Sequence, residues 1–313
     1  MVKNVPTITQ TDITRAAARL AGRVRWTPVL RLGVGDGLPC ATVLKLELLQ
    51  HTGSFKPRGA FNRMLSADLP KAGVIAASGG NHGAAVAYAA RALGVAAEIF
   101  VPAPTPQAKL DRIAGYGARV VQGGASYSEA QAACVARQME TGALDVHAYD
   151  HDAVLTGQGT VGLEFEQDAP DLTHLLIATG GGGLIGGIAA WYASRIQVIS
   201  VEPEGCPGLH DALAAGRPVP APVGGLAADS LGARQVGERM FPVARQHVAG
   251  AVLVTDDAIR DAQRFLWESC RLIAEPGGAT ALAALLSGAF VPPPGAVVGV
   301  LVCGGNTDPG KVI

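Results

Sequence analysis

The stretch HLLIATGGGGL, residues 174–184, joins a short apolar run to four consecutive glycines and the start of another apolar segment. Residues 174–178 have the length and composition of a buried β-strand. After a strand, the N–H groups of a glycine loop can converge on an anion such as a phosphate, and the helix that follows favours negative charge. Close backbone packing is the alternative explanation for the glycines. The stretch predicts one unit of an α/β fold.

The same alternation of short apolar runs and helical segments continues along the chain. Helix start signals follow Thr11, Asn81, Ser126 and Thr255. Near-continuous apolar strands between helices indicate parallel sheets covered on both faces. The strand-length runs are residues 43–46, 74–77, 97–101, 119–121, 174–178, 197–201, 251–254 and 297–302.

We therefore predict an α/β fold of two lobes, each a largely parallel twisted sheet flanked by helices. Residues 53–146 are expected to form the small domain, and residues 1–52 plus 147–313 the large one. Residues 142–156 resist assignment and are interpreted as a domain crossing. Ligands should bind in the cleft outside the carboxyl ends of the strands.

Composition excludes several classes of partner. A net charge of -1 over 313 residues, with 5% aromatic residues, argues against nucleic acid and anionic membranes. The five cysteines are scattered without metal-ligand spacing, and the first six residues lack the apolar run of a secretion signal. We expect a cytosolic protein with reduced thiols.

The segment HTGSFKPRGA, residues 51–60, surrounds Lys56 with Phe55, Pro57 and Ala60 and brings Arg58 close in sequence. An apolar, cation-flanked lysine is disfavoured as the ammonium, so its pKa should fall. A free amine together with a phosphate-binding loop is what a Schiff-base enzyme needs. A surface lysine in a turn is the alternative.

Three further glycine-containing junctions carry candidate polar groups. Residues 78–83, SGGNHG, form an anion nest in which Asn81 either contacts a bound ring or caps the helix. Cys303, in CGGN, either faces a ring nitrogen as a neutral thiol or is a buried structural cysteine. Glu275, in EPGGA, is a candidate supporting residue.

A rival interpretation uses the same glycine loop. Gly181, Gly183 and Gly186 match GxGxxG, and Glu202 ends the next strand where a ribose partner would lie. This pattern would suit an NAD-dependent oxidoreductase, in which Lys56 has no role. A non-catalytic binding protein that keeps the fold is a third class.

Taken together, the motifs resemble the fold-type II pyridoxal-phosphate enzymes, in the branch of threonine/serine dehydratases and serine racemases. The resemblance spans nearly the whole chain. The matching segments, in the family's order, are GSFKPRGA (53–60), SGGNHG (78–83), GQGT (157–160), GGGG (180–183), EPGG (275–278) and CGGN (303–306).

The resemblance implies pyridoxal 5'-phosphate as cofactor and a role for each motif. Lys56 would hold the cofactor as a Schiff base and accept the Cα proton in the β-elimination of L-threonine or L-serine to a 2-oxo acid and ammonia. The other cofactor-binding residues would be Phe55, Asn81, Gly180, Gly181, Gly182, Gly183, Leu184 and Cys303. The substrate carboxylate would lie at Ser78, Gly79, Asn81 and His82. A homodimer is expected by analogy with the family.

Two departures from the family pattern bear on the reaction. Racemases of the family carry a serine where this chain has Gly79, so elimination is favoured over racemisation. The divalent-ion site of racemase-like members keeps Glu202 and the Cys206 carbonyl here, but Gly208 replaces a carboxylate, so a bound metal is doubtful.

The substrate is open at this point. Dehydration of 3-hydroxyaspartate, dehydration of a hydroxyectoine-pathway intermediate and serine racemisation are the alternatives. The sequence shows no obvious second cationic side chain for a distal carboxylate, which disfavours dicarboxylic substrates.

Overall fold

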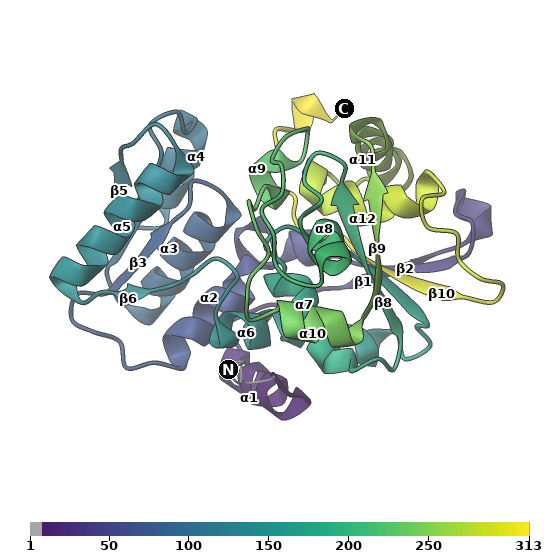
Figure 1. Cartoon of the computed structure of the whole chain (residues 1–313), viewed down its shortest axis with the longest axis horizontal. Helices are drawn as coiled ribbons and strands as arrows, with labels where there is room; N and C mark the ends of the chain where they lie inside the picture. The colour runs from purple at the N-terminus through teal and green to yellow at the C-terminus, as the bar shows by residue number, and fades with distance from the viewer. Residues whose placement is uncertain (1–7, 313) are drawn as a thin grey trace.

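The computed structural model describes residues 8–312, which form two lobes, each built around one sheet (Figure 1). The N-terminal residues used above to predict localisation lie outside this range. In Figure 1 the smaller lobe carries α3, α4 and α5, and the larger lobe carries both the glycine loop and the C-terminal strand. The predicted α/β class is confirmed. The domain boundaries at residues 53 and 146 stay a prediction.

The larger sheet has six strands within the described range, in the order β1-β2-β10-β7-β8-β9. β1 is antiparallel to β2, and the other neighbours run parallel. Because β7 and β10 are parallel neighbours, the loops after both strands leave the sheet at the same edge. The strands are β1 (Val29–Leu32), β2 (Ala41–Lys45), β7 (His174–Ala178), β8 (Gln197–Pro203), β9 (Val248–Val254) and β10 (Val297–Leu301).

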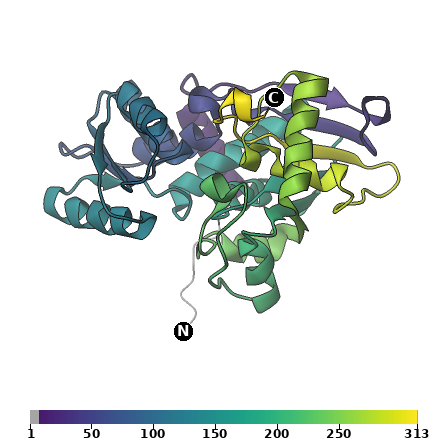
Figure 2. The same ribbon diagram turned by 90° about the horizontal axis from the view of Figure 1, so that it is seen from above.

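The smaller sheet has the order β5-β4-β3-β6, and all its pairs are parallel. Its strands are β3 (Val74–Ala77), β4 (Ala97–Val101), β5 (Arg119–Gln122) and β6 (Leu144–Asp145). The helices around it are α2 (Lys56–Leu65), α3 (Asn81–Leu93), α4 (Gln107–Gly115) and α5 (Tyr127–Thr141). Viewed from above, this lobe stands apart from the larger one (Figure 2).

Helices on both faces of the larger sheet bury its apolar strands. The last long helix, α12, packs on β7, β8 and β10, and α7 packs against α6. These helices are α1 (Gln10–Leu20), α6 (Asp152–Asp168), α7 (Gly183–Tyr192), α8 (Gly208–Ala215), α9 (Ala228–Leu231), α10 (Phe241–His247), α11 (Asp256–Cys270) and α12 (Pro276–Leu286). Short 3-10 helices are η1 (Val34–Asp36), η2 (Glu47–Leu49), η3 (His51–Gly53) and η4 (Pro309–Lys311).

Side-chain caps mark the starts of several helices. Ser126 and Thr255 cap α5 and α11 as predicted, each accepting a hydrogen bond from a backbone N–H in the first turn. The first helix begins two residues earlier than predicted, because Thr9 rather than Thr11 forms the capping box, with Asp12. The unassigned stretch 142–156 contains β6 and the start of α6.

Candidate active site

Lys56 is the first residue of α2, and its side chain is half-buried. Its Nζ donates to the Ala148 carbonyl at 3.0 Å and lies 5.1 Å from the centroid of the Phe55 ring. Burial lowers the pKa of Lys56 from 10.5 to about 8. The expected fall in pKa is confirmed, and a fraction of the amine is uncharged near neutrality.

Arg58 does not contribute to that fall, contrary to the sequence-based expectation. Its guanidinium is fully buried and donates to both oxygens of Glu47 (2.8 and 2.7 Å) and both oxygens of Glu164 (2.6 and 2.8 Å). Lys45 lies 3.3 Å from Glu164 in the same cluster. The cation beside Lys56 in sequence is therefore neutralised by two carboxylates and serves to anchor α2.

The glycine loop forms the predicted junction between β7 and α7. A Cβ on Gly181 would lie 2.4 Å from the Tyr149 ring, and a Cβ on Gly180 would lie 2.9 Å from the Leu231 carbonyl oxygen. Gly182 has φ +86°, a conformation that favours glycine. Tertiary contacts thus require the absence of side chains, and the N–H groups of the first turn of α7 have no partner within their helix.

A chain of partly buried polar contacts lies where Asn81 approaches the loop after β10. Asn81 is not the helix cap, since Gly80 holds that position. Its Nδ2 donates to Glu275 Oε1 at 2.6 Å, and its Oδ1 accepts from Asn306. Burial raises the pKa of Glu275 to about 7. Asn81 is therefore held in one orientation by two residues of the other lobe.

Cys303 follows β10 and is buried. Its thiol donates to the Gly277 carbonyl, with the sulfur 3.4 Å from the oxygen. Burial raises the pKa of Cys303 to about 12, so the group stays a neutral thiol at physiological pH. A neutral thiol can approach a neutral ring nitrogen, whereas an aspartate would hold that nitrogen protonated.

The segment at Ser78 forms the predicted nest between β3 and α3. Ser78 Oγ accepts from the Gly80 N–H at 3.2 Å, and Gly79 to Asn81 line a small cavity of about 50 Å³. The His82 ring does not face this cavity: its Nε2 lies 2.6 Å from the Val146 carbonyl oxygen, and burial lowers its pKa to about 3. Only the backbone of His82 is available at the helix N-terminus.

Two cations that the sequence did not reveal line the same cavity. Lys109 and Arg112 come from α4, and Lys109 pairs with Asp229 of α9. Arg112 donates to the Thr52 carbonyl. The expectation that no second cationic group lies near the nest was wrong, because α4 is brought there by the parallel pairing of β3 and β4.

Comparison with known proteins agrees with this arrangement. Residues 20–304 match the family described as "Pyridoxal-phosphate dependent enzyme". The chain belongs to this family. It is 41% identical over 304 residues to an L-threonine ammonia-lyase of Geobacter sulfurreducens, covering 95% of this chain and 75% of that protein. Among solved structures, maize serine racemase has a TM-score of 0.92 at 32% identity, covering 98% of this chain and 96% of that one. A threonine deaminase from T.th. has a TM-score of 0.89 at 37% identity, with coverage of 96% and 99%.

The residues present fit pyridoxal phosphate, the cofactor of this family. The backbone N–H groups of residues 180–183 and of the first turn of α7, here called the glycine cradle, can hold the phosphate, and Lys56 offers an amine with a lowered pKa. Asn81, at the start of α3 in the small lobe, and Cys303, after β10 in the large lobe, could each contact the pyridine ring of the cofactor. The dinucleotide interpretation was wrong: Glu202, its ribose partner, is fully buried beneath α8.

The divalent-ion site of racemase-like relatives does not fit this chain. Both oxygens of Glu202 accept backbone N–H groups at the start of α8, from Leu209 at 2.7 Å and His210 at 2.8 Å. Within residues 8–312, no group of three or more acidic, histidine or cysteine side chains could hold a metal. Glu202 caps a helix instead.

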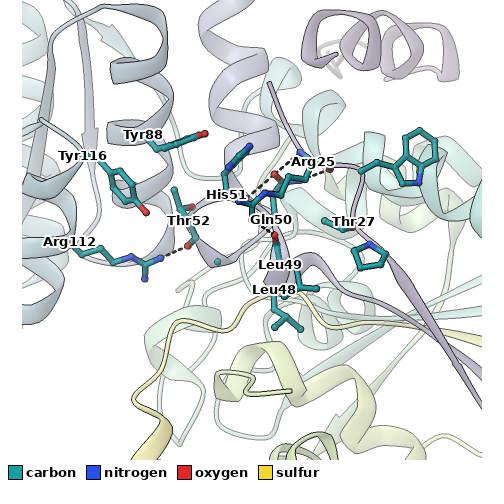
Figure 3. A pocket seen from close by; sticks show the side chains of 13 residues that line it. Arg25, Thr27, Leu48, Leu49, Gln50, His51, Thr52, Tyr88, Arg112 and Tyr116 are labelled. Atoms are coloured by element: carbon teal, nitrogen blue, oxygen red, sulfur yellow. Dashed lines mark hydrogen bonds between the residues drawn. The ribbon is translucent and has the colours of Figure 1, made fainter. Parts of the chain in front are cut away.

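A larger pocket of about 690 Å³ lies beside the site (Figure 3). Figure 3 shows Tyr88, Tyr116 and Arg112 on one side, and His51 and Arg25 on another. Lys56 is not among its lining residues, whereas Arg112 lines both this pocket and the small cavity. Lys56 does not line the small cavity either, whereas Asn81 and Glu275, which contact each other, both do.

Proposed function

We propose that this protein is an ammonia-lyase that converts L-threonine or L-serine to a 2-oxo acid and ammonia. The observation that carries the proposal is Lys56: its partly uncharged amine bonds the Ala148 carbonyl, next to Tyr149, whose ring lies against Gly181 of the glycine cradle. The names of the relatives, threonine ammonia-lyase and threonine deaminase, support the same class of substrate.

Each group of residues then has a defined task. The Ser78 hydroxyl and the first-turn N–H groups of α3 bind the substrate carboxylate. Bound pyridoxal phosphate supplies an electron sink that makes the Cα proton acidic. The Lys56 amine accepts that proton, and the β-hydroxyl leaves as water with a proton returned by the Lys56 ammonium. Addition of water then releases ammonia, so the net products are one 2-oxo acid and one ammonia.

The decisive experiment measures 2-oxo acid release from L-threonine, L-serine and their D-forms by the cofactor-loaded protein. Lys56→Ala should abolish turnover and the absorbance of the lysine-bound cofactor while the fold remains. The matched control is Lys71→Ala, an exposed lysine, which should leave both unchanged. Turnover by the Lys56 variant at the wild-type rate would refute the proposal.

Dehydration of 3-hydroxyaspartate is the second candidate, favoured by Lys109 and Arg112 at the cavity. Arg112 has no carboxylate partner among the ion pairs of the described residues, and its charge could receive a distal carboxylate. The negative charges of Asp229 and Glu275 in the same lining oppose it. A kcat/KM for 3-hydroxyaspartate above that for threonine would select this candidate.

We also propose a cytosolic homodimer. Five free cysteines suit a reducing compartment, and the exposed apolar side chains of Trp26, Val34 and Leu49 would suit a subunit interface. No described helix is long and apolar enough to cross a membrane. Light scattering of the purified protein tests the dimer, and a monomer mass would exclude it.

A further inference from the structure

Gly79 faces a side chain from the neighbouring loop. A Cβ built on Gly79 would lie 3.0 Å from Thr105 Cγ2 and 3.1 Å from Thr105 Oγ1, tighter than most real Cβ contacts. Gly79 follows β3 and Thr105 follows β4, and these parallel neighbours deliver both loops to one edge of the sheet. Thr105 thus fills the space that a side chain at residue 79 would enter.

Thr105 is fixed in this position. Its Oγ1 donates to the Pro102 carbonyl at 2.7 Å, and its backbone N–H donates to the same oxygen at 3.1 Å. Pro104 and Pro106 flank it, and their rings restrict the backbone on both sides. The hydroxyl proton is engaged within the turn, so Thr105 fills space without offering a free proton donor.

We propose that Thr105 is a specificity-determining residue that keeps position 79 without a side chain and so commits the site to elimination. The inference rests on the proposed function. Racemisation takes one proton from Cα at Lys56 and needs another proton delivered to Cα by a second donor. Neither Gly79 nor Thr105 supplies that donor. A serine at residue 79 would press on Thr105, which is held in place by its hydrogen bonds to Pro102, so a smaller residue at position 105 should make room for it.

The test is a set of four proteins: wild type, Gly79→Ser, Thr105→Ala and the double variant, all cofactor-loaded. Melting temperature is the first readout. Gly79→Ser alone should lower Tm by about 2–6 °C, as overpacking does in a chain of this size, and Thr105→Ala should restore most of that loss in the double variant. Additive shifts in Tm would overturn the packing argument.

The ratio of D-serine to pyruvate formed from L-serine is the second readout. The double variant should raise this ratio at least about tenfold over either single variant, which corresponds to about 1.4 kcal/mol between the competing steps. In the double variant the serine hydroxyl would give its proton to Cα and regain one from water. Equal ratios in Gly79→Ser and the double variant would refute the role of Thr105.

Failure of the proposed function is distinguishable from failure of this inference. If wild type releases no 2-oxo acid from any β-hydroxy amino acid, the lyase proposal fails. The coupling between residues 79 and 105 is measured separately, as the non-additivity of the Tm changes, and needs no enzymatic activity. If Gly79→Ser does not fold, Gly79→Ala with and without Thr105→Ala measures the same coupling, since the Cβ makes the close contacts.

Discussion

Replacing Arg58 with methionine should destabilise the protein by about 3–5 kcal/mol, the range for breaking a buried ion pair. The side chains of Arg58 and Glu47 are both 0% exposed, and Glu164 is 8% exposed. Without the guanidinium, the side chain of Glu47 keeps the Thr27 hydroxyl as a hydrogen-bond donor, and Glu164 keeps Lys45. The carboxylates of Glu47 and Glu164 would then stay buried without the cation that balances most of their negative charge, and this destabilises the folded state.

Thermal unfolding of the cofactor-free protein measures the effect. At about 2 °C per kcal/mol, the expected fall in Tm is about 6–10 °C. Arg58→Lys should lose less Tm than Arg58→Met but should not reach the wild-type Tm. A single ammonium cannot donate two hydrogen bonds to each of the two carboxylates, as the guanidinium does. Arg217→Met, which removes an exposed arginine, is the control and should change Tm little.

Two outcomes would contradict the reasoning. A loss below about 1 kcal/mol in Arg58→Met would mean that the cluster contributes no more than a surface pair. The variant with Arg58→Met, Glu47→Leu and Glu164→Leu should be more stable than Arg58→Met alone, because it removes the orphaned charges. If it is less stable, lost packing rather than uncompensated charge explains the effect.

Three further predictions concern the cleft and its supports. The pKa of Glu275 is raised to about 7, so its contribution to stability is present at low pH and lost as the pH rises through about 7. Glu275→Gln can keep the hydrogen bond from Asn81, so the Tm of this variant should rise relative to that of wild type as the pH is raised from about 5 to 8. A Tm difference that does not change with pH would contradict the raised pKa of Glu275. EDTA should leave Tm and activity unchanged, because α8 engages both oxygens of Glu202; a rise in Tm with Mg²⁺ would show otherwise. Lys109→Gln should cost about 0–1 kcal/mol of stability, since its partner Asp229 is exposed, yet raise KM for the amino acid; an unchanged KM would place Lys109 outside the binding site.

Sequence patterns identified most of the strands because the central parallel strands are buried on both faces and read as apolar runs. β1 was missed because it is a short antiparallel edge strand interrupted by Arg31. β6 was missed because two residues carry no periodicity. Boundaries of the remaining strands differed by three residues or fewer, as at β9, which begins at Val248 rather than residue 251.

The candidate site divides in the same way. Residues within contiguous motifs, such as Lys56 and Cys303, could be proposed from their neighbours in sequence. Tyr149, Lys109 and Thr105 could not, because each reaches the site through pairing between distant segments and carries no local signal. Arg58 was misjudged for the opposite reason. Because it is close to Lys56 in sequence, its charge was expected to lower the pKa of Lys56, but the charge is neutralised by Glu47 and Glu164.

Lys56 begins α2, whose residues Ala60, Phe61 and Met64 belong to the hydrophobic core of the small lobe. The glycine cradle and Cys303 extend from the sheet of the large lobe. A cofactor held at all these points would contact both lobes. Because Arg58 of the same helix pairs with Glu47 and Glu164, α2 is also fixed to α6 of the large lobe by ion pairs. The position of Lys56 therefore depends on this buried cluster as well as on the core of the small lobe, so a variant that weakens the cluster would also displace the amine.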